Sequence, residues 1–216
     1  MRALLLLVVS LAFVAGCGGG GDDTTTESVA TSAGGCTSID APAPRDPKSL
    51  QAPTAALDAS KTYTLTFDTS CGSFTVTLDP ELAPKTTASL VALARAGYYD
   101  DTIFHRVVPG FVIQGGDPTQ SGSGGPGYTT VDVPPSDAAY TKGVVAMAKS
   151  GVEAPGTAGS QFFVVTGDDA GLPPEYAIVG KVTEGMDTVQ RINALGVADG
   201  PPSKPVVVTS VTVRES

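Results

Sequence analysis

The stretch from Phe104 to Asp117 constrains this chain most, because it combines residues that pack with residues that can act chemically. It reads Phe-His-Arg-Val-Val-Pro-Gly-Phe-Val-Ile-Gln-Gly-Gly-Asp and contains the single histidine of the protein. If it begins as a strand, Arg106 and Val108 face one side and His105 faces the other. The Pro-Gly turn that follows shifts the face, so the orientation of the later residues stays open. We interpret the downstream chain as a scaffold and a second wall for this segment.

Short segments of alternating or β-branched residues surround this stretch and predict a mainly β protein. The expected strands are residues 63–67, 74–78, 142–148, 160–165, 176–182 and 206–213. Two helices are expected, one from Pro84 to about Ala96 and one from Gly185 to about Leu195. Short strands divided by turn residues, with only two helices, favour a closed antiparallel barrel capped by the helices.

The composition excludes several classes of function. With 216 residues and a net charge of −9, the chain has no basic patch to neutralise phosphates, so we expect no nucleic-acid partner. One histidine argues against a His-rich metal site, and we expect neither metal nor cofactor. Residues 122–127 match G-x-G-x-x-G, but no helix follows them, so we interpret them as a mobile surface loop. Single-domain length without hydrophobic heptads favours a monomer.

The N-terminus has the character of a targeting segment. Residues 1–16 contain Arg2 followed by an apolar run that is too short to span a bilayer. The run ends in Val-Ala-Gly-Cys17, which resembles a bacterial lipoprotein signal and implies a lipid anchor on Cys17 at the extracytoplasmic membrane surface. A plain secretory signal is the alternative. Residues 17–60 then predict a flexible tether rich in Gly, Thr, Pro and Ala, before a domain over residues 61–216.

Two further cysteines, Cys36 and Cys71, lie on either side of the Pro- and Ala-rich end of this tether. Outside the cytoplasm a disulfide between them is allowed, and it would pin the tether to the domain. In the chain-entropy model such a bond stabilises by about 3–4 kcal/mol. Two free thiols remain the alternative.

Four blocks of sequence, in order, resemble the cyclophilin-type peptidyl-prolyl cis–trans isomerases. They are residues 104–117, 143–148, 159–163 and 176–186, and the similarity spans about residues 61–214. The resemblance implies an eight-stranded antiparallel barrel with two capping helices. It also implies an enzyme that accelerates rotation of X–Pro bonds in proline-containing polypeptides, with no covalent intermediate.

The resemblance further assigns roles to individual residues. Arg106 falls on the catalytic arginine, with Phe111 and Gln114 beside it; a guanidinium does not exchange protons, so its role is electrostatic. The substrate-binding positions are Val112, Ala148, Lys149, Gln161, Phe163, Leu172 and Tyr176. Lys149 is expected to act through its main chain alone. We interpret His105 as a structural hydrogen-bonding residue beside the site.

Two departures from the family pattern bear on activity. Gly171 stands where well-known members carry a tryptophan, and Tyr176 stands where they carry a histidine. The missing tryptophan removes part of the pocket wall and puts tight cyclosporin binding in doubt. The alternative function is therefore a non-catalytic peptide-binding chaperone or adaptor lipoprotein on the same fold.

Overall fold

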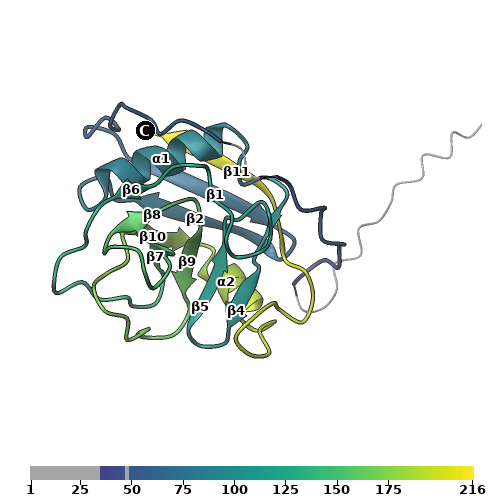
Figure 1. Ribbon diagram of the computed structural model, residues 1–216. Helices are drawn as coiled ribbons and strands as arrows, with labels where there is room; N and C mark the ends of the chain where they lie inside the picture. Colours follow the sequence, from purple (N-terminus) through teal and green to yellow (C-terminus); the bar gives the residue numbers. More distant parts are fainter. Residues whose placement is uncertain (1–34, 47–48) are drawn as a thin grey trace, which may run out of the picture. The chain divides into compact units, whose positions relative to one another are not determined.

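The computed structural model describes residues 35–46 and 49–216, which contain a mainly β unit with two helices (Figure 1). The predicted signal segment and Cys17 lie outside the described residues. The strands are β1 (Tyr63–Thr69), β2 (Gly72–Leu78), β3 (Thr102–Ile103), β4 (Arg106–Val108), β5 (Val112–Gly115), β6 (Thr130–Val131), β7 (Val144–Met147), β8 (Thr157–Ala158), β9 (Phe162–Val165), β10 (Ile178–Glu184) and β11 (Val207–Glu215). The helices are α1 (Pro84–Arg95) and α2 (Met186–Asn193).

The strand order corrects the prediction of a closed eight-stranded barrel. Nine described strands form one curled antiparallel sheet in the order β3-β11-β1-β2-β10-β7-β9-β5-β4, and β6 pairs separately with β8. The edge strands β3 and β4 form no ladder with each other. Both edges are bonded instead to the segment before β11. The Phe104 N–H, next to β3, donates to the Val206 carbonyl (3.0 Å), and the Val107 N–H in β4 donates to the Gly200 carbonyl (2.8 Å). The sheet therefore curls but stays open.

Alternation along the central strands sends side chains to two separate apolar clusters. On β5, Ile113 enters the main core while Val112 enters a second cluster on the other face of the sheet; on β9, Phe162 and Phe163 divide in the same way. The buried members of the second cluster are Val112, Tyr140, Ala146, Phe163 and Val165. Because both faces are covered, β9 is apolar at every position, and its pattern alone does not reveal which face is which.

The two helices begin and end within two residues of their predicted positions. The first turn of α1 lacks a cap from its own chain neighbours; instead, Asp132 accepts the Thr86 N–H and hydroxyl, both at 2.7 Å, at the positive end of the helix. Gly185 precedes α2 with a φ of +73°, and a Cβ there would lie 2.3 Å from the Ser73 carbonyl oxygen, so only glycine fits. Within the described ranges, no helix is long and apolar enough to cross a membrane.

The described part of the expected tether lies against the domain as an N-terminal strap (residues 35–46 and 49–60). A disulfide joins Cys36 to Cys71, 35 residues away. The Arg45 guanidinium donates to backbone carbonyls just beyond α1, at 2.9 and 2.6 Å, and the Leu50 N–H bonds to the Pro126 carbonyl at 2.8 Å. The strap is thus anchored at several points, and the prediction of a flexible tether does not describe this part of it.

The glycine-rich loop, predicted to be mobile, is organised by one buried carboxylate. Asp117 accepts backbone N–H groups from Thr119 (2.8 Å), Gly122 (2.7 Å) and Gly124 (3.1 Å). Burial acts to raise the pKa of Asp117, but the hydrogen bond from the Thr119 hydroxyl, together with those from the backbone N–H groups, outweighs it and lowers the pKa below its usual value. These hydrogen bonds hold the loop in one conformation. The only feature of the sequence that could have indicated this is Asp117 itself, at the end of the Gly-Gly-Asp turn.

Candidate active site

The site begins as one row of residues that lie directly opposite each other across four strands. Arg106 on β4 faces Gln114 on β5, Gln114 faces Phe163 on β9, and Phe163 faces Ala146 on β7. Residues that face each other across antiparallel strands present their side chains on the same side of the sheet. Register therefore brings a cation, an amide and an aromatic ring together.

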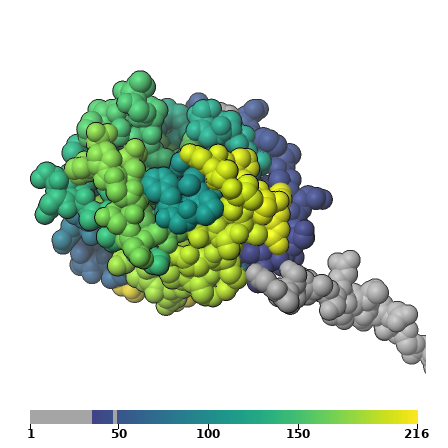
Figure 2. Space-filling view, turned by 90° about the horizontal axis from the view of Figure 1, so that it is seen from below, coloured from purple at the N-terminus to yellow at the C-terminus, as the bar shows by residue number. Residues whose placement is uncertain are grey.

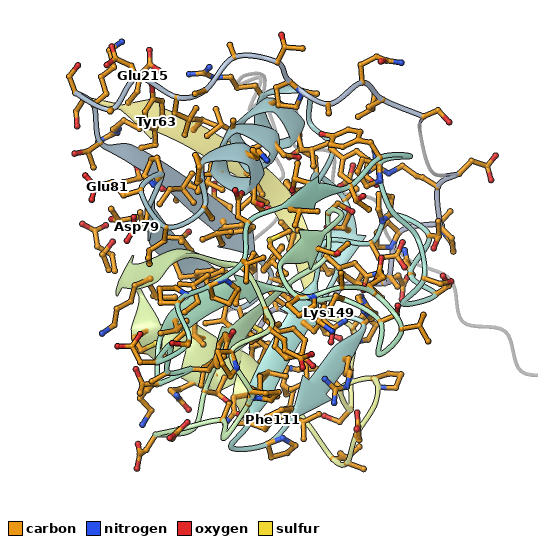
Figure 3. The ribbon with its side chains drawn as sticks, turned by 60° about the vertical axis from the view of Figure 1, so that its left-hand side comes forward. Tyr63, Asp79, Glu81, Phe111, Lys149 and Glu215 are labelled. Atoms are coloured by element: carbon orange, nitrogen blue, oxygen red, sulfur yellow. A yellow bond between two sulfur atoms is a disulfide. The ribbon has the colours of Figure 1, made fainter. Side chains whose placement is uncertain are left out.

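The predicted catalytic and substrate-binding residues, except Gln161, line a single cavity of about 300 Å³. It is lined by Arg106, Phe111, Val112, Gln114, Ala148, Lys149, Phe163, Leu172 and Tyr176. Figure 3 places Phe111 near the end of the molecule opposite Tyr63 and Glu215, and Lys149 between the two ends. The cavity therefore lies apart from the β1–β11 pair. Its lining residues form a polar side and an aromatic side.

The polar wall consists of Arg106, Gln114 and Gln161, joined in a chain of hydrogen bonds. Arg106 donates through Nη1 to the Gln114 side-chain oxygen at 3.2 Å, and Gln114 donates to the Gln161 oxygen at 3.1 Å. Gln161 in turn donates to the Gly124 carbonyl at 3.0 Å. The guanidinium also lies 5.8 Å from the centre of the Phe111 ring, a cation–π distance. A permanent positive charge is thus held at the edge of an apolar cavity.

Asp199 is a partner of Arg106 that sequence reasoning missed. Its carboxylate accepts the Nε and Nη2 hydrogens of Arg106, at 2.5 and 3.0 Å. The hydrogen bond from Arg106 lowers the pKa of Asp199. Asp199 belongs to a Gly- and Pro-rich loop 93 residues along the chain, and no periodic pattern indicates that this loop reaches the site.

Phe163 and Tyr176 form the surface of the aromatic wall, and the buried Tyr140 packs against both of them as its third member. The Phe163 and Tyr176 rings meet edge to face with centroids 5.7 Å apart, and Tyr140 lies 6.3 Å from Phe163 and 5.9 Å from Tyr176. The Tyr140 hydroxyl donates to the Tyr176 carbonyl (2.8 Å) and accepts its N–H (2.9 Å), which fixes the Tyr176 backbone. Burial raises the pKa of Tyr140. This residue was also missed, because it lies in an aperiodic loop before β7.

Lys149 contributes more than the main-chain contact predicted for it. Its side chain is only 3% exposed, and its ammonium lies 3.0 Å from the Glu175 carboxylate. The ammonium also donates to the Glu153 carbonyl at 3.2 Å and lies 5.4 Å from the centre of the Tyr176 ring. The side chain therefore ties two loops together at the edge of the cavity.

A wider groove of about 840 Å³ adjoins the cavity. Gln114, Ala148 and Lys149 line both hollows, while Gln161 lines the groove alone. The predicted substrate-binding residues are therefore divided between the two hollows. The fixed glycine-rich loop and Ser49 of the N-terminal strap form the far side of the groove.

The rim at Gly171 is open, as the departure from the family pattern suggested. Gly171 has a φ of +61°, and a Cβ built there would meet nothing within 4 Å. Leu172, the next residue, still lines the cavity. The pocket thus keeps its floor and loses a side wall.

His105 lies beside the site but does not make the hydrogen bonds expected of it. Within the described chain, neither ring nitrogen of His105 makes a hydrogen bond of good geometry, although both atoms are buried and the Gln161 side chain is near enough to act on the ring. Burial is the main cause that lowers the pKa of this histidine. The structure therefore gives His105 a packing position beneath the polar wall. Cys71, at the β1–β2 turn, and its disulfide partner Cys36 are not among the residues that line the cavity.

No group of histidine, cysteine and acidic residues suited to a metal ion exists among the described residues. The cavity itself offers an apolar seat, an oriented guanidinium and amide groups that can pair with peptide backbone. Such a site can hold an apolar ring and stabilise charge that develops beside it.

The chain is similar in sequence and in structure to cyclophilin-type isomerases. The family model described as "Cyclophilin type peptidyl-prolyl cis-trans isomerase/CLD" matches residues 64–213. A "Peptidyl-prolyl cis-trans isomerase-like 1" of Emericella nidulans is 45% identical over 132 residues, which cover 59% of this chain and 80% of that protein. A "Probable peptidyl-prolyl cis-trans isomerase A" of Mycobacterium leprae is 38% identical over 170 residues, or 69% of this chain and 91% of that protein. The crystal structure of a cyclophilin-type isomerase from Cryptosporidium parvum has a TM-score of 0.65 and 31% identity, and the match covers 71% of this chain and 98% of that one.

Proposed function

The chain belongs to the family of cyclophilin-type peptidyl-prolyl cis–trans isomerases, and from this premise we propose that it accelerates X–Pro bond rotation in extracytoplasmic polypeptides. The observation that carries the proposal is the position of Arg106. Its guanidinium is fixed at the edge of an apolar cavity, directly opposite Gln114 and in line with Phe163. Faster rotation would assist the folding of client proteins without changing the isomer equilibrium.

The reaction needs no bond to be made or broken. Resonance gives the peptide C–N bond a rotation barrier of about 18–20 kcal/mol. In the twisted transition state this resonance is lost, and the prolyl nitrogen gains a lone pair. A guanidinium that donates to this nitrogen stabilises the twisted state more than either planar isomer. An acceleration of about 10⁵-fold would require about 7 kcal/mol of such differential binding.

The aromatic wall and the polar wall have different roles in the proposed reaction. The aromatic wall, with Val112 and Leu172, seats the proline ring so that it stays still while the rest of the peptide turns. Gln114 and Gln161 offer amide groups to the substrate backbone. Since a guanidinium does not release its proton near neutral pH, the rate should not depend on proton transfer at Arg106.

A protease-coupled assay tests the proposal. Chymotrypsin cleaves the peptide Ala-Ala-Pro-Phe-anilide only when its X–Pro bond is trans, so catalysed isomerisation speeds the slow phase of cleavage. We expect wild type to speed this phase, and Arg106→Ala to lower kcat/KM by about 100-fold or more. A wild-type protein without effect would support the alternative, a non-catalytic peptide-binding module, which the open rim at Gly171 favours.

We also propose that the domain works outside the cytoplasm, attached to a membrane through a lipid on Cys17. The lipoprotein-like sequence that ends at Cys17 supports this, and so does the Cys36–Cys71 disulfide, because such bonds persist in oxidising compartments. Cys17→Ser should move the protein from the membrane fraction to the soluble fraction. An unchanged membrane fraction would contradict the lipid anchor, and Arg106→Ala serves as a control that should not alter fractionation.

A further inference from the structure

The loop that follows α2 reaches back to the active site and places a carboxylate behind Arg106. In Figure 2 this yellow C-terminal segment lies against the teal segment that contains the β4–β5 turn. The Asp199 carboxylate meets Arg106 side-on, through Nε at 2.5 Å and Nη2 at 3.0 Å. A side-on pair of this kind fixes the plane of the guanidinium as well as its charge.

The remaining contacts of Arg106 complete its orientation. Nη1 donates to Gln114 at 3.2 Å, and the group lies 5.8 Å from the centre of the Phe111 ring. A guanidinium has five N–H donors. The bonds to Asp199 and Gln114 leave one N–H on each Nη atom for a substrate. Asp199 thus bonds to one edge of the guanidinium, and the remaining N–H groups of the two Nη atoms are left for a ligand in the cavity.

The loop that carries Asp199 is itself fixed next to Arg106. Its neighbour Gly200 accepts the Val107 N–H at 2.8 Å, and the Ser203 N–H bonds to the Leu195 carbonyl at 2.8 Å. At the start of the loop, a Cβ on Gly196 would lie 2.8 Å from the Pro109 ring, so the two segments are closely packed. The backbone next to Asp199 is therefore hydrogen-bonded to Val107, the residue that follows Arg106.

The solvent exposure of the Arg106–Asp199 ion pair indicates a role in orientation rather than in folding stability. The Asp199 side chain is 67% exposed and that of Arg106 is 30% exposed. Exposed ion pairs contribute little to folding stability. An arginine side chain, however, has many rotamers, and catalysis by a preorganised charge depends on which of them is occupied.

We propose that Asp199 is a positioning residue, which holds the Arg106 guanidinium in the orientation needed at the cavity. The proposal rests on the isomerase function proposed above. Without Asp199 the guanidinium keeps its charge but samples other rotamers, so the transition state loses stabilisation while the seat for the proline ring is unchanged. The loss should therefore appear in kcat more than in KM.

The test compares Asp199→Ala and Asp199→Asn with wild type, using Glu215→Ala as a matched control. Glu215 also pairs with an arginine, Arg95 at 2.9 Å, and is 40% exposed, but it lies at the far end of the domain (Figure 3). Asp199→Ala should lower kcat about fivefold with little change in KM, and Asp199→Asn, which keeps an acceptor, should recover part of the loss. Glu215→Ala should leave both constants unchanged.

A second readout observes the guanidinium directly. The Arg106 Nε–H signal in nitrogen-edited NMR, assigned by its absence in Arg106→Ala, should be protected from solvent exchange in wild type and lost in Asp199→Ala. An active wild type with an unchanged kcat in Asp199→Ala, or with a raised one, would overturn the positioning role alone. An inactive wild type would overturn the proposed function and the positioning role with it.

Discussion

The two walls of the cavity are built on different principles. The aromatic wall of Tyr140, Phe163 and Tyr176 belongs to a packed cluster, in which Tyr140 is 0% and Phe163 4% exposed. The polar wall around Arg106 is partly exposed and held by hydrogen bonds from separate segments, including the loop of Asp199. The comparison indicates that one wall carries shape and stability while the other carries charge. Substitutions should therefore separate the two properties.

The largest effect on stability is expected from Phe163→Ala. A large cavity in a packed cluster costs about 3–5 kcal/mol, a sizeable part of the total stability of a domain. Unfolding in urea, followed by circular dichroism, should show this loss. Arg106→Ala is the matching change in the polar wall and should alter the unfolding free energy by less than about 1 kcal/mol. Equal losses in the two variants would break the distinction between the walls.

A smaller effect is expected from Tyr140→Phe, which removes only the hydroxyl that bonds to both backbone groups of Tyr176. Leaving these groups unpaired should cost about 1–2 kcal/mol and loosen the seat of the proline ring. KM should rise a few-fold while kcat stays constant. Tyr63→Phe is the control, because the Tyr63 hydroxyl also accepts a backbone N–H, at 3.1 Å, but lies far from the cavity (Figure 3). A change in kcat alone would contradict the assignment of Tyr140 to binding.

The smallest effect concerns His105, which lies beneath the polar wall. Burial lowers its pKa below the usual value of about 6.5, so the folded state disfavours the protonated ring. The stability from this neutral ring is complete above pH ~6.5 and decreases as the pH falls through that value toward the lowered folded pKa. Melting temperatures at pH 7.5 and 5.5 should differ less in His105→Gln than in wild type. Identical pH dependence in both proteins would show that His105 is not the responsible group.

Sequence reasoning reached the elements whose signals are local. The helix from Pro84 and the hairpin of β1 and β2 follow from proline position and two-residue alternation, and both occur close to their predicted bounds. The pocket residues came from the family resemblance, and the structure brings them around one cavity. The strands β6 and β8 were not predicted, because two residues are too few to show a period.

Apart from the Cys36–Cys71 disulfide, which the sequence predicted and the structure contains, features that depend on contacts between distant segments could not be predicted. Asp199 and Tyr140 lie in aperiodic loops, and their roles exist only because the fold brings them to Arg106 and Tyr176. The strap and the glycine-rich loop looked mobile by composition, yet side chains of Arg45 and Asp117 fix their backbones. The closed barrel was wrong for the same reason, since the bonding of the sheet edges is set by the loop before β11.

If the two walls act as proposed, the charge of the polar wall accelerates rotation about a proline bond whose ring the aromatic wall holds. Exchange NMR on an Ala-Pro peptide tests it without a protease, using enzyme far below the peptide concentration. Wild type should give cross-peaks between the cis and trans resonances. Arg106→Ala should still shift the peptide signals on binding, but should give no exchange above the uncatalysed rate. Equal exchange with wild type and Arg106→Ala, or none with either, would contradict the account.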